Sequence, residues 1–212
     1  MKRILALIIV VLTVGGVVAV SHAADADSNN QLVWCGLDYS MVKMIGTADF
    51  RKPSEIFPDM LQTWNGLFMQ EMLPKLEKIS PSVVSDLNAV SARNGNTSTN
   101  QIIHEDGTRK EMVEASDITT NDLAKMVHGY DLKHSEGIGL VYVMDRLVKA
   151  QQTGCLYVVF FDISSRKILV VERMTNAAGG AGFRNYWFRP IKTATEKLPG
   201  LYKQAKTALA QK

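Results

Sequence analysis

The sequence predicts an α+β fold, with a mostly antiparallel sheet of about four strands and two main helices packed on it. Two observations support this prediction. Residues 155–171 have the pattern of two strands joined by a short polar turn, and residues 179–187 bend through glycine into a helical segment. Apolar residues at three- and four-residue spacing on either side of this region supply the helices.

The central feature is a hairpin. Leu156–Phe161 is β-branched, aromatic or aliphatic at every position, which is typical of a strand buried on both faces. Asp162–Lys167 provides turn-forming residues, and Ile168–Val171 resumes the β pattern. Because the connection is short, we expect the two strands to be antiparallel neighbours.

A glycine cluster follows the hairpin, at Gly179, Gly180 and Gly182. Glycine permits positive φ and a close approach of the backbone. One interpretation is a strand-to-helix corner that needs no ligand. The other is an anion-binding nest of backbone N–H groups, with Arg184 beside it. The corner is the simpler interpretation, because the cluster lacks the Lys-Ser/Thr pair of a phosphate-binding loop.

The N-terminal half is predicted to hold a strand and two helices. Leu32–Ile45 alternates partly and is expected to form one long strand, bent at Gly36. An apolar stripe over Phe57–Met72 predicts a helix that ends or kinks at Pro74. Residues 80–96 have helical spacing and are predicted as a second helix, with a strand as the alternative.

The second half alternates short helices with strands. Either Thr119 or Thr120 is expected to cap a short helix. Leu140–Met144 is a further β run, so the last three strands should form a meander. Phe183–Leu198 again follows a helical stripe, and the chain from Leu201 onward is expected to be a frayed tail.

Residues 1–23 have the three parts of a secretory signal peptide. Lys2-Arg3 precedes the uncharged run Ile4–Val20, and small residues stand before a cleavage site after Ala23. Cleavage would leave residues 24–212 as a single domain. An uncleaved anchor is the alternative, but this run is short for a membrane span. We therefore expect a periplasmic or secreted protein with no stable membrane span.

The charge balance argues against nucleic acid as a partner. Without Lys2 and Arg3, 22 basic residues face 21 acidic residues, a formal charge of +1. Proteins that bind nucleic acid use a surplus of basic residues to replace counterions. This chain has no such surplus.

Two cysteines, Cys35 and Cys155, fall at predicted strand starts. A disulfide in an oxidising compartment and two small buried residues are equal alternatives. Neither cysteine has a flanking His, Lys or helix start that would favour a thiolate. An enzyme that uses a cysteine nucleophile is therefore not predicted.

Only His104-Glu105-Asp106 suggests a metal site. It lies within Thr97–Glu114, a polar stretch that is predicted to form a surface loop. Three consecutive residues cannot all face one ion, although His128 and His134 could converge on them. The chain also lacks Gly-x-Ser-x-Gly, His-Glu-x-x-His and dinucleotide-binding patterns. We expect neither a metal nor a cofactor.

Three segments resemble a group of exported bacterial proteins of unknown function. They are Gly137-Ile-Gly-Leu-Val, Val159-Phe-Phe-Asp-Ile and Ala178-Gly-Gly-Ala-Gly-Phe-Arg-Asn-Tyr-Trp. The likeness covers roughly the C-terminal third, and it is weaker in the first strand and in the helix before Gly137. It implies a location in the cell envelope and brings no particular activity.

The leading functional hypothesis is a non-catalytic envelope protein that acts by binding or assembly, with itself or with another envelope protein. The alternative is a small enzyme or binder that acts on an anionic ligand at the glycine corner. Arg184, Asn185 and Arg189 would hold the anion, and Asp162 or Glu172 would be the acid or base. An enzyme requires a pocket where such groups converge, whereas a binding module is expected to show an exposed apolar patch or a long free sheet edge.

Overall fold

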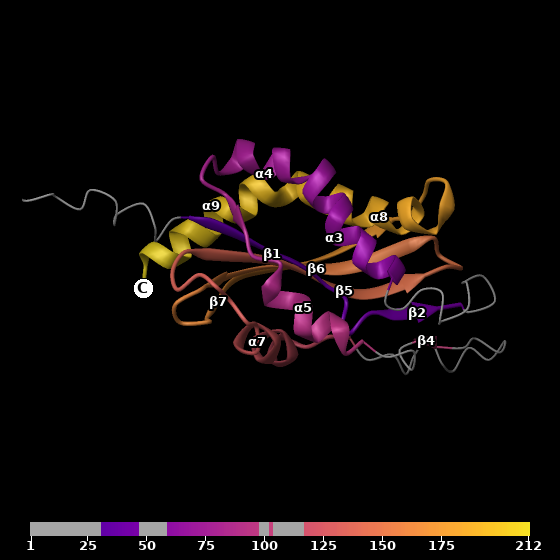
Figure 1. Cartoon of the computed structure of the whole chain (residues 1–212), viewed down its shortest axis with the longest axis horizontal. Coiled ribbons are helices and arrows are strands. Elements are labelled where there is room, and N and C mark those ends of the chain that lie inside the picture. The colour runs from indigo at the N-terminus through magenta and orange to yellow at the C-terminus, as the bar shows by residue number, and fades with distance from the viewer. Residues whose placement is uncertain (1–30, 47–58, 98–101, 104–116) are drawn as a thin grey trace, which may run out of the picture.

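The computed structural model describes residues 31–46, 59–97, 102–103 and 117–212. These residues form one mixed seven-stranded sheet with helices on both faces (Figure 1). The predicted α+β class is confirmed. The predicted sheet is wrong in two respects, because it has seven strands rather than about four and because many of its pairs are parallel.

The parallel part of the sheet contains the first five strands. These are β1 (Leu32–Asp38), β2 (Lys43–Ile45), β3 (Val84–Ser85), β4 (Ile102–Ile103) and β5 (Ile138–Val148). β1 and β2 pair one after the other with the same edge of β5, β3 pairs with β1, and β4 pairs with β2. Each pairing joins segments far apart in the chain, as parallel strands require.

The antiparallel part is the predicted meander. β6 (Thr153–Asp162) pairs with β5 on one side and with β7 (Ile168–Ala177) on the other. Every residue of β6 after Thr153 is buried, as expected for a strand covered on both faces. The hairpin prediction is confirmed, and β7 extends further than the predicted Val171, to Ala177.

Helices cover the two faces of the sheet unequally (Figure 1). One face carries α3 (Asp59–Glu71), α4 (Leu73–Ile79), α8 (Gly182–Ala194) and α9 (Leu198–Ala210), which we call the four-helix layer. The other face carries α5 (Asn88–Gly95) and α7 (Thr120–His128), which we call the two-helix layer. Strand residues alternate between the two cores: Leu140 and Tyr142 face the four-helix layer, whereas Val141 and Val143 face the two-helix layer.

Local signals place several helix ends where the sequence predicts them. α3 ends at Glu71, and α4 begins at Leu73 with Pro74 in its first turn, where proline is tolerated. Thr119 caps α7: its hydroxyl accepts a hydrogen bond from the Asp122 N–H at 3.1 Å, and the Asp122 carboxylate accepts one from the Thr119 N–H at 3.0 Å. This reciprocal arrangement is a capping box.

Two strand predictions need correction. The predicted long strand over Leu32–Ile45 is broken by a turn at residues 39–42, and the bend at Gly36 is a bulge at a φ of 105°. Residues 80–96 contain both predicted alternatives, because the short strand β3 precedes α5.

The predicted frayed tail is also wrong. A 3-10 turn, η3 (Thr195–Lys197), leads directly into α9, which continues to Ala210. Its residues Leu201, Tyr202 and Ala205 are buried against the sheet, so the helix belongs to the core. The lysines between these positions conceal the apolar stripe in the sequence.

The predicted signal peptide and the His104-Glu105-Asp106 pattern lie outside the described residues. Among the helices that the structure does describe, none is long and apolar enough to cross a membrane. Export and cleavage after Ala23 therefore stay predictions.

Candidate functional site

The glycine cluster forms the predicted strand-to-helix corner. β7 ends at Ala177, and the chain turns through Gly180 and Gly182, at φ values of 119° and 76°, into α8. The Gly179 N–H donates a hydrogen bond of 3.0 Å to the Tyr186 carbonyl oxygen. Because this N–H group is already bonded, Gly179 contributes no free donor to an anion nest.

Helix α8 has an inner face that belongs to the core and an outer face that carries polar side chains. Trp187, Ile191 and Ala194 are buried against the sheet. The Trp64 indole N–H of α3 donates a hydrogen bond of 3.2 Å to the Arg184 carbonyl oxygen, which ties the first turn of α8 to α3. The outer residues are therefore presented on a fixed support.

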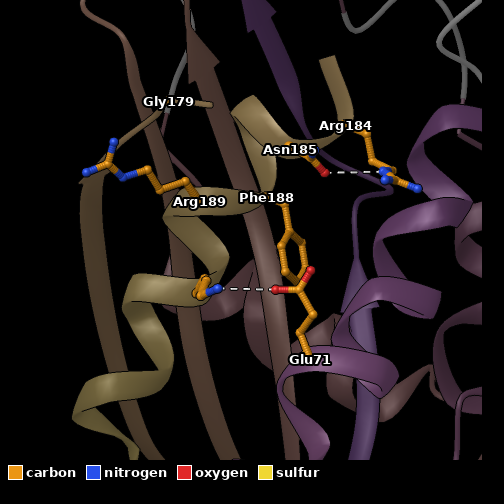
Figure 2. Close-up of a pocket in the computed structure, with 7 residues that line it drawn as sticks. Glu71, Gly179, Arg184, Asn185, Phe188 and Arg189 are labelled. Atoms are coloured by element: carbon orange, nitrogen blue, oxygen red, sulfur yellow. Dashed lines mark hydrogen bonds and ion pairs between the residues drawn. The ribbon is translucent and has the colours of Figure 1, made fainter. Parts of the chain in front are cut away.

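A pocket of about 450 Å³ lies along this outer face, between α8, the end of α3 and the corner (Figure 2). Four of the six residues predicted to hold a ligand line it, namely Gly179, Arg184, Asn185 and Arg189. Gly180 and Gly182 do not line the pocket and serve to turn the chain. The other lining residues are Glu71, Phe188 and Lys192.

The α8 residues share one stripe because a helix turns by ~100° per residue. Figure 2 shows Arg184 and Arg189 extending to opposite sides of the pocket, with the Phe188 ring between them. The Arg184 Nε donates a hydrogen bond of 3.3 Å to the Asn185 Oδ1. Across the pocket, the Lys192 ammonium lies 3.2 Å from the Glu71 carboxylate.

Positive charge is in excess around this pocket. Lys192 and Glu71 neutralise one another, whereas neither Arg184 nor Arg189 forms an ion pair with any residue in the described part of the chain. Guanidinium groups bind carboxylates and phosphates through paired, charge-assisted hydrogen bonds. The pocket is therefore suited to a small anion. Its described lining contains no histidine, cysteine or hydroxyl side chain that could act as a nucleophile.

The acid and base proposed for an enzymatic role are wrongly placed. Asp162 ends β6, and the corner lies beside the start of β6, ~30 Å away at ~3.3 Å per residue. Glu172 lies in the middle of β7, and its carboxylate is paired with the Lys197 ammonium at 3.4 Å. Neither carboxylate lines the pocket.

Asp162 instead organises the turn between β6 and β7. Its carboxylate accepts hydrogen bonds from the Ser164 N–H at 3.2 Å and the Ser164 hydroxyl at 2.9 Å, and it also contacts Ser165 and Lys212. Burial opposes ionisation of Asp162, but the hydrogen bonds outweigh it and lower its pKa to about 2. A carboxylate with this pKa is a poor general base near neutral pH.

The two cysteines do not form the disulfide that the sequence left open. Cys35 and Cys155 are both free and buried. They lie on β1 and β6, which flank β5, so the two strands are ~10 Å apart, beyond the ~7 Å limit for a disulfide. Burial raises the pKa of both thiols, which makes the reactive thiolate scarce.

A second crevice, of about 320 Å³, was not predicted. It lies between α3 and α5, where β1 extends beyond β3. Asn65 accepts a hydrogen bond from the Leu37 N–H at 2.8 Å, and Asn94 accepts one from the Tyr39 N–H at 2.9 Å. These amides replace a missing strand neighbour, so the crevice has a structural role. No short-range sequence signal indicates it, because the two asparagines are distant in the chain.

Metal-binding side chains do not cluster in the part of the chain that the structure covers. Within those ranges, no group of three or more His, Cys, Asp or Glu residues could hold a metal ion. His128 and His134 belong to this part, whereas His104-Glu105-Asp106 does not.

Comparison with known proteins assigns the chain to no family. No protein-family model matches it, and no curated protein matches it significantly. Its function is therefore inferred from the side chains of the pocket and from the sequence.

Proposed function

We propose that the protein is an exported, non-catalytic binding protein of the bacterial cell envelope, and that it holds a small anionic ligand against α8. One observation carries the binding role. Arg184, Asn185 and Arg189 line one pocket of about 450 Å³, and neither guanidinium has a counter-charge among the described residues.

Export is supported by the sequence. Residues 1–23 carry the basic start, the apolar run and the small residues of a signal peptide. The resemblance of the C-terminal third to exported bacterial proteins points to the same compartment. An envelope location brings the protein into contact with small anions taken up from outside the cell and with anionic groups of the envelope itself.

The size and chemistry of the pocket support a small ligand. A volume of about 450 Å³ falls within the range of pockets that bind small molecules. Arg184 and Arg189 extend to opposite sides, so a ligand with anionic groups at two ends would engage both (Figure 2). A ligand with several carboxylates or phosphates therefore fits better than one with a single charge.

A binding role is favoured over catalysis because the carboxylate that lines the pocket, Glu71, is already paired. Glu71 is the one acidic residue in the described lining, and it is paired with Lys192. A general base must be within hydrogen-bond reach of the substrate and free to take a proton. The ion pair already engages a Glu71 carboxylate oxygen with the Lys192 ammonium group.

Calorimetric titration with citrate and with inorganic phosphate tests the proposal. Arg184→Ala and Arg189→Ala should each weaken citrate binding by about tenfold or more, as expected for the loss of a charge-assisted hydrogen bond. Lys167→Ala is a matched control, because Lys167 is an exposed cation on the β6–β7 turn, outside the pocket. Unchanged citrate affinity in both arginine variants would show that this pocket is not the anion site.

Self-association is a second candidate role, and the edge of the sheet favours it. β7 has ten residues and pairs only with β6 within the described chain, so its outer edge is open. An open edge of this length can pair with a second copy of the same strand. Sedimentation velocity should then show a fraction of dimer that increases with protein concentration. A monomer at all concentrations would exclude this role.

A further inference from the structure

A further hollow, larger than the pocket on α8, lies in the four-helix layer between α4 and α9. Its volume is about 710 Å³, and it shares no lining residue with the pocket on α8. The lining combines lysines with an apolar floor. It consists of Lys75, Lys78, Ile79, Thr195, Glu196, Pro199, Tyr202, Lys203 and Lys206.

The lysines reach this hollow in pairs because of their spacing. Lys75 and Lys78 are three residues apart on α4, and Lys203 and Lys206 are three residues apart on α9. Residues at this spacing lie on one side of a helix. The two helices therefore present four ammonium groups around one hollow.

These four ammonium groups are poorly compensated. Glu196 is the one carboxylate in the described lining, and none of the four lysines forms an ion pair with a residue in the described ranges. Like charges held close together repel one another, and a bound anion would relieve that repulsion.

The floor of the hollow is apolar and firmly held. Tyr202 is 7% exposed, and its hydroxyl group donates a hydrogen bond of 3.5 Å to the Ser80 hydroxyl. Its ring packs against Phe160, with 6.1 Å between the ring centroids, and Lys206 lies 5.3 Å above the Tyr202 ring centroid. Pro199 completes an apolar surface that the lysines surround.

We propose that this hollow binds a small amphiphilic anion, a molecule with a carboxylate or phosphate head and an apolar body. The lysines would bind the head, and the apolar side chains of Ile79 and Pro199, with the accessible part of Tyr202, would bind the body. Lysine ammonium groups act as point charges and do not impose the planar geometry of a guanidinium, so either type of head fits. The volume is sufficient for a ligand of this kind.

The chemistry separates this site from the pocket on α8. A compact anion without an apolar body, such as inorganic phosphate, would leave the floor of the hollow unused. A neutral amphiphile would leave the lysines unpaired. The proposal therefore requires both parts in one molecule.

Calorimetric titration with decanoate, at concentrations where it stays monomeric, tests the proposal on the full chain. Decanoate should bind at least tenfold more tightly than inorganic phosphate or octyl glucoside. Lys203→Gln/Lys206→Gln should weaken decanoate binding by about tenfold, because two of the four cations are lost. Lys125→Gln/Lys167→Gln removes two exposed cations outside the hollow and should bind decanoate as the unaltered protein does.

An independent pair of substitutions keeps the test decisive. Lys75→Gln/Lys78→Gln alters α4 instead of α9 and should produce a similar loss, with thermal melting showing that each variant folds. Equal decanoate binding by both hollow variants and the control would overturn the proposal. Phosphate or octyl glucoside binding as tightly as decanoate would overturn it too. So would binding to anionic phospholipid vesicles without binding to decanoate, since that result would indicate a membrane surface.

Discussion

The two faces of the sheet differ in how they hold charge. On the face of the two-helix layer, Asp38 and Asp145 are completely buried, and each has a cation beside it. Arg93 lies 2.9 Å from Asp38, and Arg146 and Arg173 lie 2.9 Å and 3.1 Å from Asp145. Both of these buried carboxylates are therefore paired with cations inside the molecule.

Charge on the four-helix layer is exposed and unbalanced. The four helices and η3 carry eight lysine and arginine residues against four acidic residues. Arg184 and Arg189 line one hollow, and Lys203 and Lys206 line another, with no ion pair to any described residue.

This difference separates structural charges from charges available to a ligand. A buried charge must be paired, because leaving it alone in the interior is costly, so its partners fix the positions of the strands. Exposed cations on a rigid helix have no such constraint, and they create a positive field at the surface. This difference supports the proposal that anions bind on the four-helix layer.

The largest expected effect tests whether the inner face of α8 is core. Trp187 is 2% exposed and packs in the four-helix core. Trp187→Ala should lower the free energy of unfolding by about 3–5 kcal/mol, as for other buried aromatic residues. Urea denaturation measures this change. A loss below about 1 kcal/mol would mean that α8 is not anchored, and the pocket on its outer face would lose its support.

The next effect contrasts one carboxylate from each face. Asp145→Asn removes the buried carboxylate that pairs with Lys43, Arg146 and Arg173. It should cost about 2–4 kcal/mol, at or below the lower end of the range for a broken buried pair, because Asp117 still pairs with both arginines. Glu71→Gln removes an exposed pair and should cost no more than about 1 kcal/mol. Denaturation of both variants checks the contrast. Equal losses would contradict the distinction between the two faces.

A smaller effect is expected at the corner. Gly180 has a φ of 119°, which side chains other than glycine rarely adopt, so Gly180→Ala should cost about 1–2 kcal/mol. Gly200→Ala is the matched control, because Gly200 lies in α9 with open space around it and alanine favours helices. Thermal unfolding should show a loss at Gly180 and none at Gly200. A stable Gly180→Ala variant would mean that the corner does not depend on glycine.

The parts of the fold that local signals define were predicted well. The β6–β7 hairpin, the cap at Thr119 and the glycine corner each depend on residues within a few positions of one another. The parallel pairing of β1 with β5 was not predicted, because it joins Trp34 to Leu140 across most of the domain. β3 was ambiguous because it has two residues.

The candidate site shows the same limit. Four of the pocket residues are close in sequence, so the glycine pattern of the corner predicts them together: Gly179, Arg184, Asn185 and Arg189. Glu71 was missed because it comes from α3 and meets Lys192 across 121 positions. The hollow between α4 and α9 could not be predicted, because the lysines of α9 conceal its apolar stripe in the sequence.

We propose above that anions bind to the exposed cations of the four-helix layer. Two-dimensional ¹H–¹⁵N NMR during a citrate titration can locate such binding, because it reports backbone amides along the chain and the Nε–H of each arginine. We expect the largest shifts at Gly179, Arg184, Asn185 and Arg189, and none around Asp38 and Asp145. Shifts concentrated on the two-helix layer, or no shifts at saturating citrate, would contradict it.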